Sequence, residues 1–286
     1  MGTMKTSHCL TEMADALEIS KSGFFVHRHK EERPRRKEDQ ELASQIEPLF
    51  IASRRTYGSP RIMHALRKTG RRCGKNRIAR LMRSRGLRAK QKRRFRPQTT
   101  QSDHNLPIAQ NWLARIPAPD RPAQVWVADI TYIQTHEGWL YLSGILDHCS
   151  RRCVGWQADD SLTTNLVTRA WHKAWKNQRP DPGLLHHSDR GVQYASSDFR
   201  ALLYGCGAAP SMSRKANCYD NAIMESFWAT LKTECFASSI PQTKTQAKLM
   251  LFDYIETFYN RSRLHSTLGY QSPLQFENNF TNSTTD

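Results

Sequence analysis

The spacing of hydrophobic and polar positions along this 286-residue chain changes near residue 123. Before that point, apolar residues recur every three or four positions, as in residues 10–17 and 42–50, which predicts amphipathic helices. After it, β-branched and aromatic residues form runs bounded by turn residues, which predicts strands. The pattern therefore indicates a helical first part, followed by a part that mixes strands with helices.

Two features interrupt the first helical patterns. Residues 30–41 are charged and polar, so we expect a linker there. Pro48 lies in the middle of the next helical pattern, which contains Leu42, Ile46 and Phe50. Because proline has no backbone N–H and its ring clashes with the preceding turn, it should kink or end that helix.

A pair of short helices follows. Ser59-Pro60 predicts a helix start, with Ser59 as the N-cap and proline in the first turn, and Gly70 ends that helix. A second, basic helix begins at Lys75 and closes at Gly86, which suits a left-handed cap. Two short helices joined by a tight turn favour a helix-turn-helix, although any small basic helical hairpin has the same pattern.

The second part of the chain predicts a sheet. The expected elements are the strands VWVADITYIQT, WLYLSGILDH and RRCVGWQA, a helix over about 162–177, a strand over 184–187, a helix over about 196–205, a strand over 208–212 and a last helix. This order predicts an α/β fold with a mixed five-stranded sheet and flanking helices, the ribonuclease H-like arrangement. In that arrangement the middle of the first strand lies beside the end of the fourth, and the last helix crosses nearby.

Three acidic residues occupy the positions that this arrangement brings together. Asp129 lies within VWVADITYI, Asp189 follows the short strand in LLHHSDRG, and Glu225 lies in the helical pattern NCYDNAIMESFWATLK. An acid inside a buried strand is costly unless a cation compensates it, and oxygen ligands from separate elements hold Mg²⁺ near phosphates. Lys232 follows Glu225 by two helical turns on the same face. The pattern indicates a phosphoryl-transfer site that cuts or joins DNA.

Basic charge is concentrated in one segment. The chain carries 43 Lys and Arg against 26 Asp and Glu, a formal net charge of +17. Residues 48–102 contain the whole excess and no acid, whereas residues 1–47 and 103–286 are close to neutral. Apolar residues recur through the basic segment, which a solvated tail or face would not need. A folded, phosphate-binding domain is therefore the better interpretation.

Composition argues against several other classes. No apolar run approaches the ~20 residues that span a bilayer, and the amino terminus lacks a signal-peptide core, so we expect a soluble protein. The seven cysteines form no Cys-x-x-Cys pair, which argues against a disulfide framework and a zinc finger. His186 and His187 have no partner at ligand spacing, so packing or DNA contact is favoured over zinc binding.

Six runs of the sequence resemble the second-reading-frame product of the insertion-sequence-three family of bacterial transposases, in the superfamily of DDE transposases and retroviral-type integrases. They cover most of residues 55–275 and read TYGSPRI, GKNRIARLMRSRGLRA, VWVADITYI, HHSDRGVQYAS, SMSRKANCYDNAIMESFWATLKTE and YNRSRLHSTLGYQSP. The resemblance implies Mg²⁺-dependent cleavage and strand transfer at insertion-element ends, with two ions per active site and Mn²⁺ as a substitute. It also implies a bacterial cytoplasmic protein associated with the nucleoid.

The resemblance also assigns roles to residues. Asp129, Asp189 and Glu225 match the acids that are both catalytic and metal-binding, and Lys232 matches a basic position that contacts the DNA end. Asn221, one turn before Glu225, could orient the site or touch DNA, and it could equally cap its helix. The expected DNA-contacting residues are Lys232, Asn221, Arg214, Lys75, Arg77, Arg80, Arg83 and Arg88.

The chain is expected to contain five segments. These are an N-terminal helical extension and linker (1–47), a basic helix-turn-helix DNA-binding domain (48–102), a linker (103–122), a ribonuclease H-like integrase catalytic core (123–240) and a C-terminal helical extension and tail (241–286). The expected partners are element ends and target DNA, further copies of the chain on DNA, and the upstream-frame product as a fusion or partner. Two alternatives stay open: a catalytically inactive DNA-binding regulator and a ribonuclease H-type nuclease.

Overall fold

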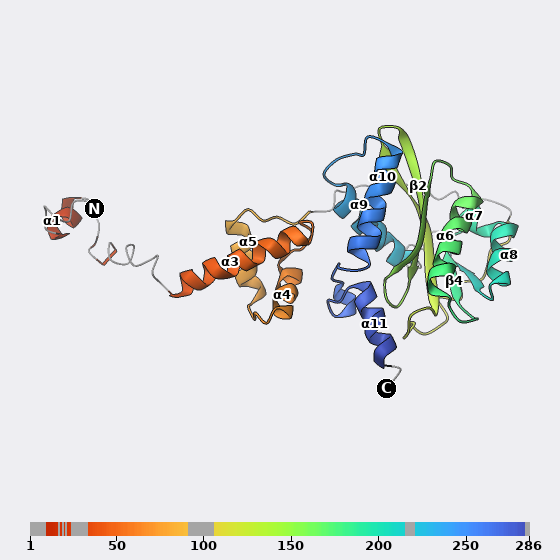
Figure 1. Cartoon of the computed structure of the whole chain (residues 1–286), viewed down its shortest axis with the longest axis horizontal. Helices are drawn as coiled ribbons and strands as arrows, with labels where there is room; N and C mark the ends of the chain where they lie inside the picture. Colours follow the sequence, from red (N-terminus) through yellow and green to blue (C-terminus); the bar gives the residue numbers. More distant parts are fainter. Residues whose placement is uncertain are drawn as a thin grey trace. The chain divides into compact units, whose positions relative to one another are not determined.

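The structure is a computed structural model that describes residues 10–16, 18, 20, 22–23, 34–90, 106–214 and 221–283. It divides into two compact units, residues 1–89 and residues 90–286, which we call the helical unit and the sheet unit. Figure 1 draws the helical unit in red and orange and the sheet unit in yellow to blue. Among the described helices, none is long and apolar enough to cross a membrane.

The helical unit is held together by the apolar faces of its helices. Its described helices are α1 (Leu10–Ala16), α3 (Pro34–Ala52), α4 (Ser59–Lys68) and α5 (Lys75–Ser84). α3 packs against both α4 and α5, and the buried side chains of this core are Leu42, Ile46, Phe50, Ile62, Leu66, Ile78, Leu81 and Met82. Gly70 and Gly86 follow α4 and α5 with φ of 83° and 66°, left-handed values that suit glycine. Both predicted helix ends are therefore confirmed.

Three details of this unit differ from the predictions. Residues 34–41, inside the expected linker, form the first turns of α3, where acids pair with Arg77 of α5 and with Arg71 of the loop before it. Pro48 lies inside α3 and does not end it, because apolar residues on both sides of it are buried in the core and offset the lost hydrogen bond. Ser59 is the first residue of α4, and Gly58 takes the N-cap position that we assigned to Ser59.

The sheet unit contains the predicted mixed five-stranded sheet. Its strands are β1 (Val125–Thr135), β2 (Gly138–Asp147), β3 (Cys153–Asp159), β4 (Leu185–Ser188) and β5 (Ala209–Met212). They lie in the order β3-β2-β1-β4-β5. β1, β2 and β3 pair antiparallel, while β4 pairs parallel with β1 on one side and with β5 on the other. This topology confirms the predicted fold class.

Helices cover both faces of the sheet (Figure 1). One face carries α6 (Thr164–Gln178), α7 (Val192–Ala195) and α8 (Ser197–Gly205), whose side chains share a buried cluster with Trp126 and Ala128 of β1. Successive side chains of a strand point to opposite faces, so Asp129 points away from that cluster. It points toward α9 (Ala222–Phe236), which packs against β1 together with α10 (Lys244–Phe252).

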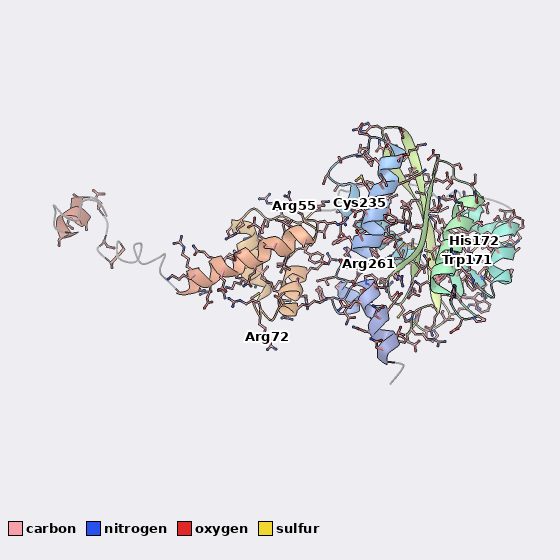
Figure 2. The ribbon with its side chains drawn as sticks, in the orientation of Figure 1. Arg55, Arg72, Trp171, His172, Cys235 and Arg261 are labelled. Carbon is pink, nitrogen blue, oxygen red and sulfur yellow. The ribbon has the colours of Figure 1, made fainter. Side chains whose placement is uncertain are left out.

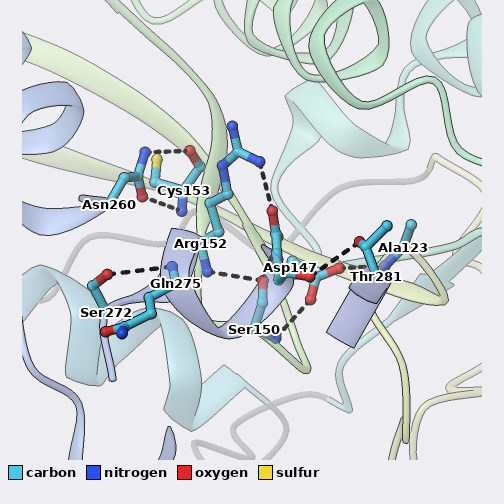
Figure 3. A network of polar contacts seen from close by, with 10 residues as sticks. Ala123, Asp147, Ser150, Arg152, Cys153, Asn260, Ser272, Gln275 and Thr281 are labelled. Atoms are coloured by element: carbon cyan, nitrogen blue, oxygen red, sulfur yellow. Dashed lines mark hydrogen bonds and ion pairs between the residues drawn. The ribbon is translucent and has the colours of Figure 1, made fainter. Parts of the chain in front are cut away.

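The segment after α10 is helical, as expected of the C-terminal extension, but only part of it is α-helix. Asp253–Tyr259 forms a π-helix, Ser266–Leu268 a 3₁₀ turn, and Pro273–Ser283 the last helix, α11. The side-chain oxygen of Asn260 accepts from the backbone N–H of Cys153, and its amide nitrogen donates to the Cys153 carbonyl, each at 3.0 Å (Figure 3). This pair of bonds fastens the C-terminal segment to β3.

Candidate functional site

Sheet register places the first two predicted acids side by side. Ala128 of β1 pairs in parallel with Ser188 of β4, and this is the last pair between the two strands. Asp129 and Asp189 are the next residues on each strand. Because parallel strands run in the same direction, the two carboxylates arrive at neighbouring positions. The sequence pattern alone predicts this juxtaposition, and the strand pairing produces it.

Asp129 is only partly accessible to solvent, and both of its carboxylate oxygens accept hydrogen bonds. The backbone N–H of Ile130 donates to Oδ1 at 2.8 Å, and the indole Nε1–H of Trp228 donates to Oδ2 at 3.0 Å. Burial, followed by the negative charges of Asp189 and Glu225, raises the pKa of Asp129 to about 8, although the two donors act in the opposite direction. The two charge contributions indicate that Asp189 and Glu225 each lie within electrostatic reach of Asp129.

Glu225 and Lys232, both on α9, lie within electrostatic reach of Asp129. Glu225 lies in the first turn of this helix and is exposed to solvent. Lys232 is half-buried; burial lowers its pKa, and the charge of Asp129 acts in the opposite direction. Helix α9 therefore places one acid and one base, two turns apart, beside the ends of β1 and β4.

The loop after β4 holds Asp189 in place. The backbone N–H of Gly191 donates to Asp189 Oδ1 at 3.0 Å, and Arg190 Nε donates to the Ser213 carbonyl at 2.7 Å. A Cβ on Gly191 would approach Asp189 Oδ1 to 3.1 Å, so glycine is the residue that leaves the carboxylate room here. Tyr194, a buried residue of α7 just after this loop, has a pKa that is raised by burial and then by the charges of Asp129 and Asp189.

The three acids come from separate elements, and they do not form a complete metal-binding cluster among the described residues. Within the described ranges, no three His, Cys, Asp or Glu side chains are grouped closely enough to hold a metal ion together. The donor chemistry nevertheless suits a hard divalent cation, because all three groups offer carboxylate oxygens and none offers sulfur or imidazole. The arrangement brings together acidic side chains from a strand, a loop and a helix at one end of the sheet.

The remaining residues predicted near this site lie as follows. Asn221 is the residue before α9; it is buried, its side chain does not cap the helix, and its Oδ1 bonds to no residue that the structure describes. Arg214 is exposed just after β5. His186 and His187 are both buried, and His187 Nδ1 contacts Ser211 Oγ at 2.9 Å, so packing is confirmed for these histidines.

Sequence reasoning missed two residues of this site, Trp228 and Gly144. Trp228 lies on α9 between Glu225 and Lys232, three residues after the first and four before the second, so all three share one helix face. Gly144 is paired directly with Asp129 across β1 and β2. The spacing of Trp228 from the acid was a usable signal, whereas the contact with Gly144 depends on strand register.

The basic residues of the helical unit divide into two groups. Some bind acids of α3: Arg77 Nε lies 2.6 Å from Asp39 Oδ1, and Arg80 Nη2 lies 2.5 Å from Asp39 Oδ2. The predicted DNA-contacting residues that are exposed and have no ion pair among the described residues are Lys75, Arg83 and Arg88. Arg55 and Arg72 also extend away from the helices (Figure 2).

Known families match nearly the whole described chain. The model of an integrase core domain matches residues 119–218, a second model of an integrase core domain matches residues 225–280, and an HTH-like domain matches residues 37–95. The integrase matches contain β1 to β5 and α9 to α11, and the HTH-like match contains α4 and α5. The helical unit therefore carries a helix-turn-helix-like domain, which is a DNA-binding type, and the sheet unit carries an integrase core.

Two relatives extend the match over both units. The chain is 44% identical over 268 residues to the insertion element IS600 uncharacterized 31 kDa protein of Shigella sonnei, covering 94% of this chain and 98% of that protein. It is 38% identical over 269 residues to the transposase InsF for insertion sequence IS3A of Escherichia coli strain K12, covering 93% of each. A weaker likeness links it to the catalytic core of HTLV-2 integrase in complex with magnesium, with TM-score 0.40, 15% identity, and coverage of 55% of this chain and 97% of that one. These relatives and domain matches show that the chain belongs to the insertion-sequence-three family of transposases.

Proposed function

We propose that this transposase cleaves DNA at insertion-element ends and joins the new ends to target DNA, with Asp129, Asp189 and Glu225 as its catalytic and metal-binding residues. The observation that supports the proposal is the convergence of three acids from β1, the loop after β4 and α9. Burial, and then the charges of the other two acids, raises the pKa of Asp129. Concentrated negative charge of this kind is costly, and a divalent cation would neutralise it.

The three carboxylates would hold Mg²⁺, with Mn²⁺ as a substitute and two ions in each site. The carboxylate oxygens of Asp129, Asp189 and Glu225 would together hold these ions. When bound, such ions act as Lewis acids on phosphoryl oxygens and activate the attacking oxygen at neutral pH.

The protein's own contribution is orientation. Phosphoryl transfer needs an in-line nucleophile and little covalent chemistry from the enzyme. The Gly191 N–H and the Ile130 N–H fix one oxygen each of Asp189 and Asp129, so two of the ligands are held before DNA arrives. Lys232, half-buried beside Asp129, would bind a phosphate of the DNA end, with Asn221 and Arg214 at the edge of the same site.

Binding to DNA would depend on the helical unit. Lys75, Arg83 and Arg88 would contact phosphates, while Arg77 and Arg80 are held by acids of α3. On this proposal residues 48–102 are the DNA-binding domain and residues 123–240 the catalytic core. The active form would contain several copies of the chain on DNA, and the upstream-frame product would join as a fusion or partner.

A strand-transfer assay tests the proposal. Asp129→Asn, Asp189→Asn and Glu225→Gln should each reduce the joining of a labelled pre-cut element end to below a few per cent of wild type. Asp181→Asn, an exposed acid in the connection before β4, is the matched control and should join normally. Because each variant loses only one negative charge, binding of the same DNA should be unchanged or slightly tighter.

The same assay separates the alternatives. A ribonuclease H-type nuclease would degrade the labelled end without joining it, and an inactive DNA-binding regulator would bind it without any product. Wild-type joining by any one of the three acid variants would remove that residue from the site.

A further inference from the structure

We infer that Trp228 is a positioning residue, whose indole N–H holds the Asp129 carboxylate in the orientation that the metal site uses. This inference rests on the proposed role of Asp129 as a ligand. Trp228 Nε1 donates to Asp129 Oδ2 at 3.0 Å, from a side chain that is only 6% exposed. The bond joins the helix that carries Glu225 to the strand that carries Asp129, so it fixes the two ligands relative to each other.

The hydrogen bonds leave the carboxylate able to bind a cation. Oδ1 of Asp129 receives the Ile130 N–H and Oδ2 receives the Trp228 indole, one donor on each oxygen. A carboxylate oxygen has two lone pairs, so one on each oxygen is still available. With a donor on each oxygen, rotation of the carboxylate group would break a bond, and the group is held in one plane.

The indole itself is held in place from two sides. Phe227 packs against its ring with centroids 4.8 Å apart. On the other side is Gly144, the residue paired with Asp129 across β1 and β2. A Cβ at this glycine would lie 2.6 Å from Cη2 of Trp228, far inside van der Waals contact. Glycine at position 144 therefore makes the space in which the indole reaches Asp129.

Burial of an indole in this sheet unit does not by itself require such a bond. The Nε1 atoms of Trp126 and Trp171 are buried and have no hydrogen-bond partner among the described residues. Trp156, on β3, donates to Glu256 Oε1 at 2.8 Å. It is paired with Gly144 and so lies two strands from Asp129. Trp156 thus offers an indole–carboxylate bond of the same kind to an acid outside the triad, which makes it the matched control.

The test compares Trp228→Phe with Trp156→Phe in the full chain. Both changes keep an aromatic ring and remove one indole donor to a carboxylate. Removing groups that orient metal ligands typically lowers metal affinity 10–100-fold. We expect Trp228→Phe to raise the Mg²⁺ concentration for half-maximal strand transfer about tenfold. Calorimetric Mn²⁺ binding without DNA should weaken by a similar factor, and Trp156→Phe should change neither.

Two further variants keep the test decisive if Trp228→Phe folds poorly. Gly144→Ala should displace the indole and weaken Mn²⁺ binding although Trp228 is present. Trp228→His keeps a ring N–H on a smaller ring and should recover part of the affinity that Trp228→Phe loses. Equal Mn²⁺ affinity in wild type and Trp228→Phe would overturn the inference. If Asp129→Asn also binds Mn²⁺ like wild type, the proposed metal site itself is wrong, which is a different result.

Discussion

Charged side chains are arranged differently in the helical unit and in the sheet unit. In the helical unit, arginines pair with α3 acids near solvent; Arg85 and Glu47 lie 3.1 Å apart, with side chains 38% and 47% exposed. In the sheet unit, Arg263 and Glu234 are 5% and 7% exposed and form two hydrogen bonds of 2.7 and 2.8 Å. Pairs of the first kind contribute little to folding, because water solvates them and salt screens them.

This difference separates exposed ion pairs, which contribute little to stability, from a buried ion pair that helps to hold the fold together. Replacing one of the exposed, paired arginines should therefore cost the fold little. Replacing the buried Arg263 should cost much more, because it also fixes Glu234 on α9, which accepts a third bond from Tyr254 at 2.8 Å. Asp129 is a third case, an acid whose pKa is raised first by burial and then by its acidic neighbours. Each case leads to a different measurable consequence.

The largest effect on stability should come from the buried pair. Arg263→Ala leaves Glu234 buried without its cation, and loss of one partner of a buried pair typically costs about 3–5 kcal/mol of unfolding free energy. The exposed pair of Arg169 and Asp159, 3.2 Å apart, is the control, and Arg169→Ala should cost less than ~1 kcal/mol. Urea unfolding followed by tryptophan fluorescence measures both, since all seven tryptophans lie in the sheet unit. Equal losses for the two variants would contradict the comparison.

A smaller effect should appear in the pH dependence of the metal-free protein. The pKa of Asp129 is raised from 3.8 to about 8 in the folded state, so the folded protein holds this proton more tightly than the unfolded chain. Its stability should therefore fall as pH rises from about 4 to about 8, and Asp129→Asn should remove this fall. At pH 8 without metal, we expect the variant to melt about 2–4 °C above wild type, the shift that ~1 kcal/mol produces in a domain of this size.

The comparison of melting temperatures at several pH values checks this sign. At or below about pH 4 the two proteins should melt at similar temperatures, because Asp129 is then largely protonated in the unfolded chain as well as in the folded wild type. A gap of constant size from pH 4 to pH 8 would show that Asp129→Asn acts through packing and not through ionisation.

The smallest effect should distinguish the arginines of α5. Each phosphate neutralised contributes about −0.9 to the slope of log K against log salt concentration. Arg83→Ala should reduce the slope for duplex DNA by about that amount, because Arg83 is exposed and unpaired among the described residues. Arg77→Ala, which removes a residue already bound to Glu38 and Asp39, should change the slope much less. Identical slopes for the two variants would mean that the α3 acids release Arg77 to the DNA.

Much of the fold was predictable because its signals are local. The β-branched runs of β1 to β3 and the glycines after α4 and α5 act over a few residues, so their predictions are confirmed. The prediction from Pro48 was wrong because α3 buries apolar side chains against α4 and α5. This burial outweighs the local cost of the proline. The π-helix over Asp253–Tyr259 has an apolar spacing that suits an α-helix as well, so the sequence pattern could not separate the two.

Residue type and spacing alone indicate the candidate chemical groups of this protein: three acids in their separate settings, a lysine two turns beyond the last, and a basic helical segment. No packing can alter those features. Which side chains meet depends on the tertiary structure. Strand register places Gly144 opposite Asp129 and so admits the indole of Trp228, and the packing of α3 on α5 binds Asp39 to Arg77. These contacts join residues tens of positions apart, and their existence depends on the free energy of the whole fold.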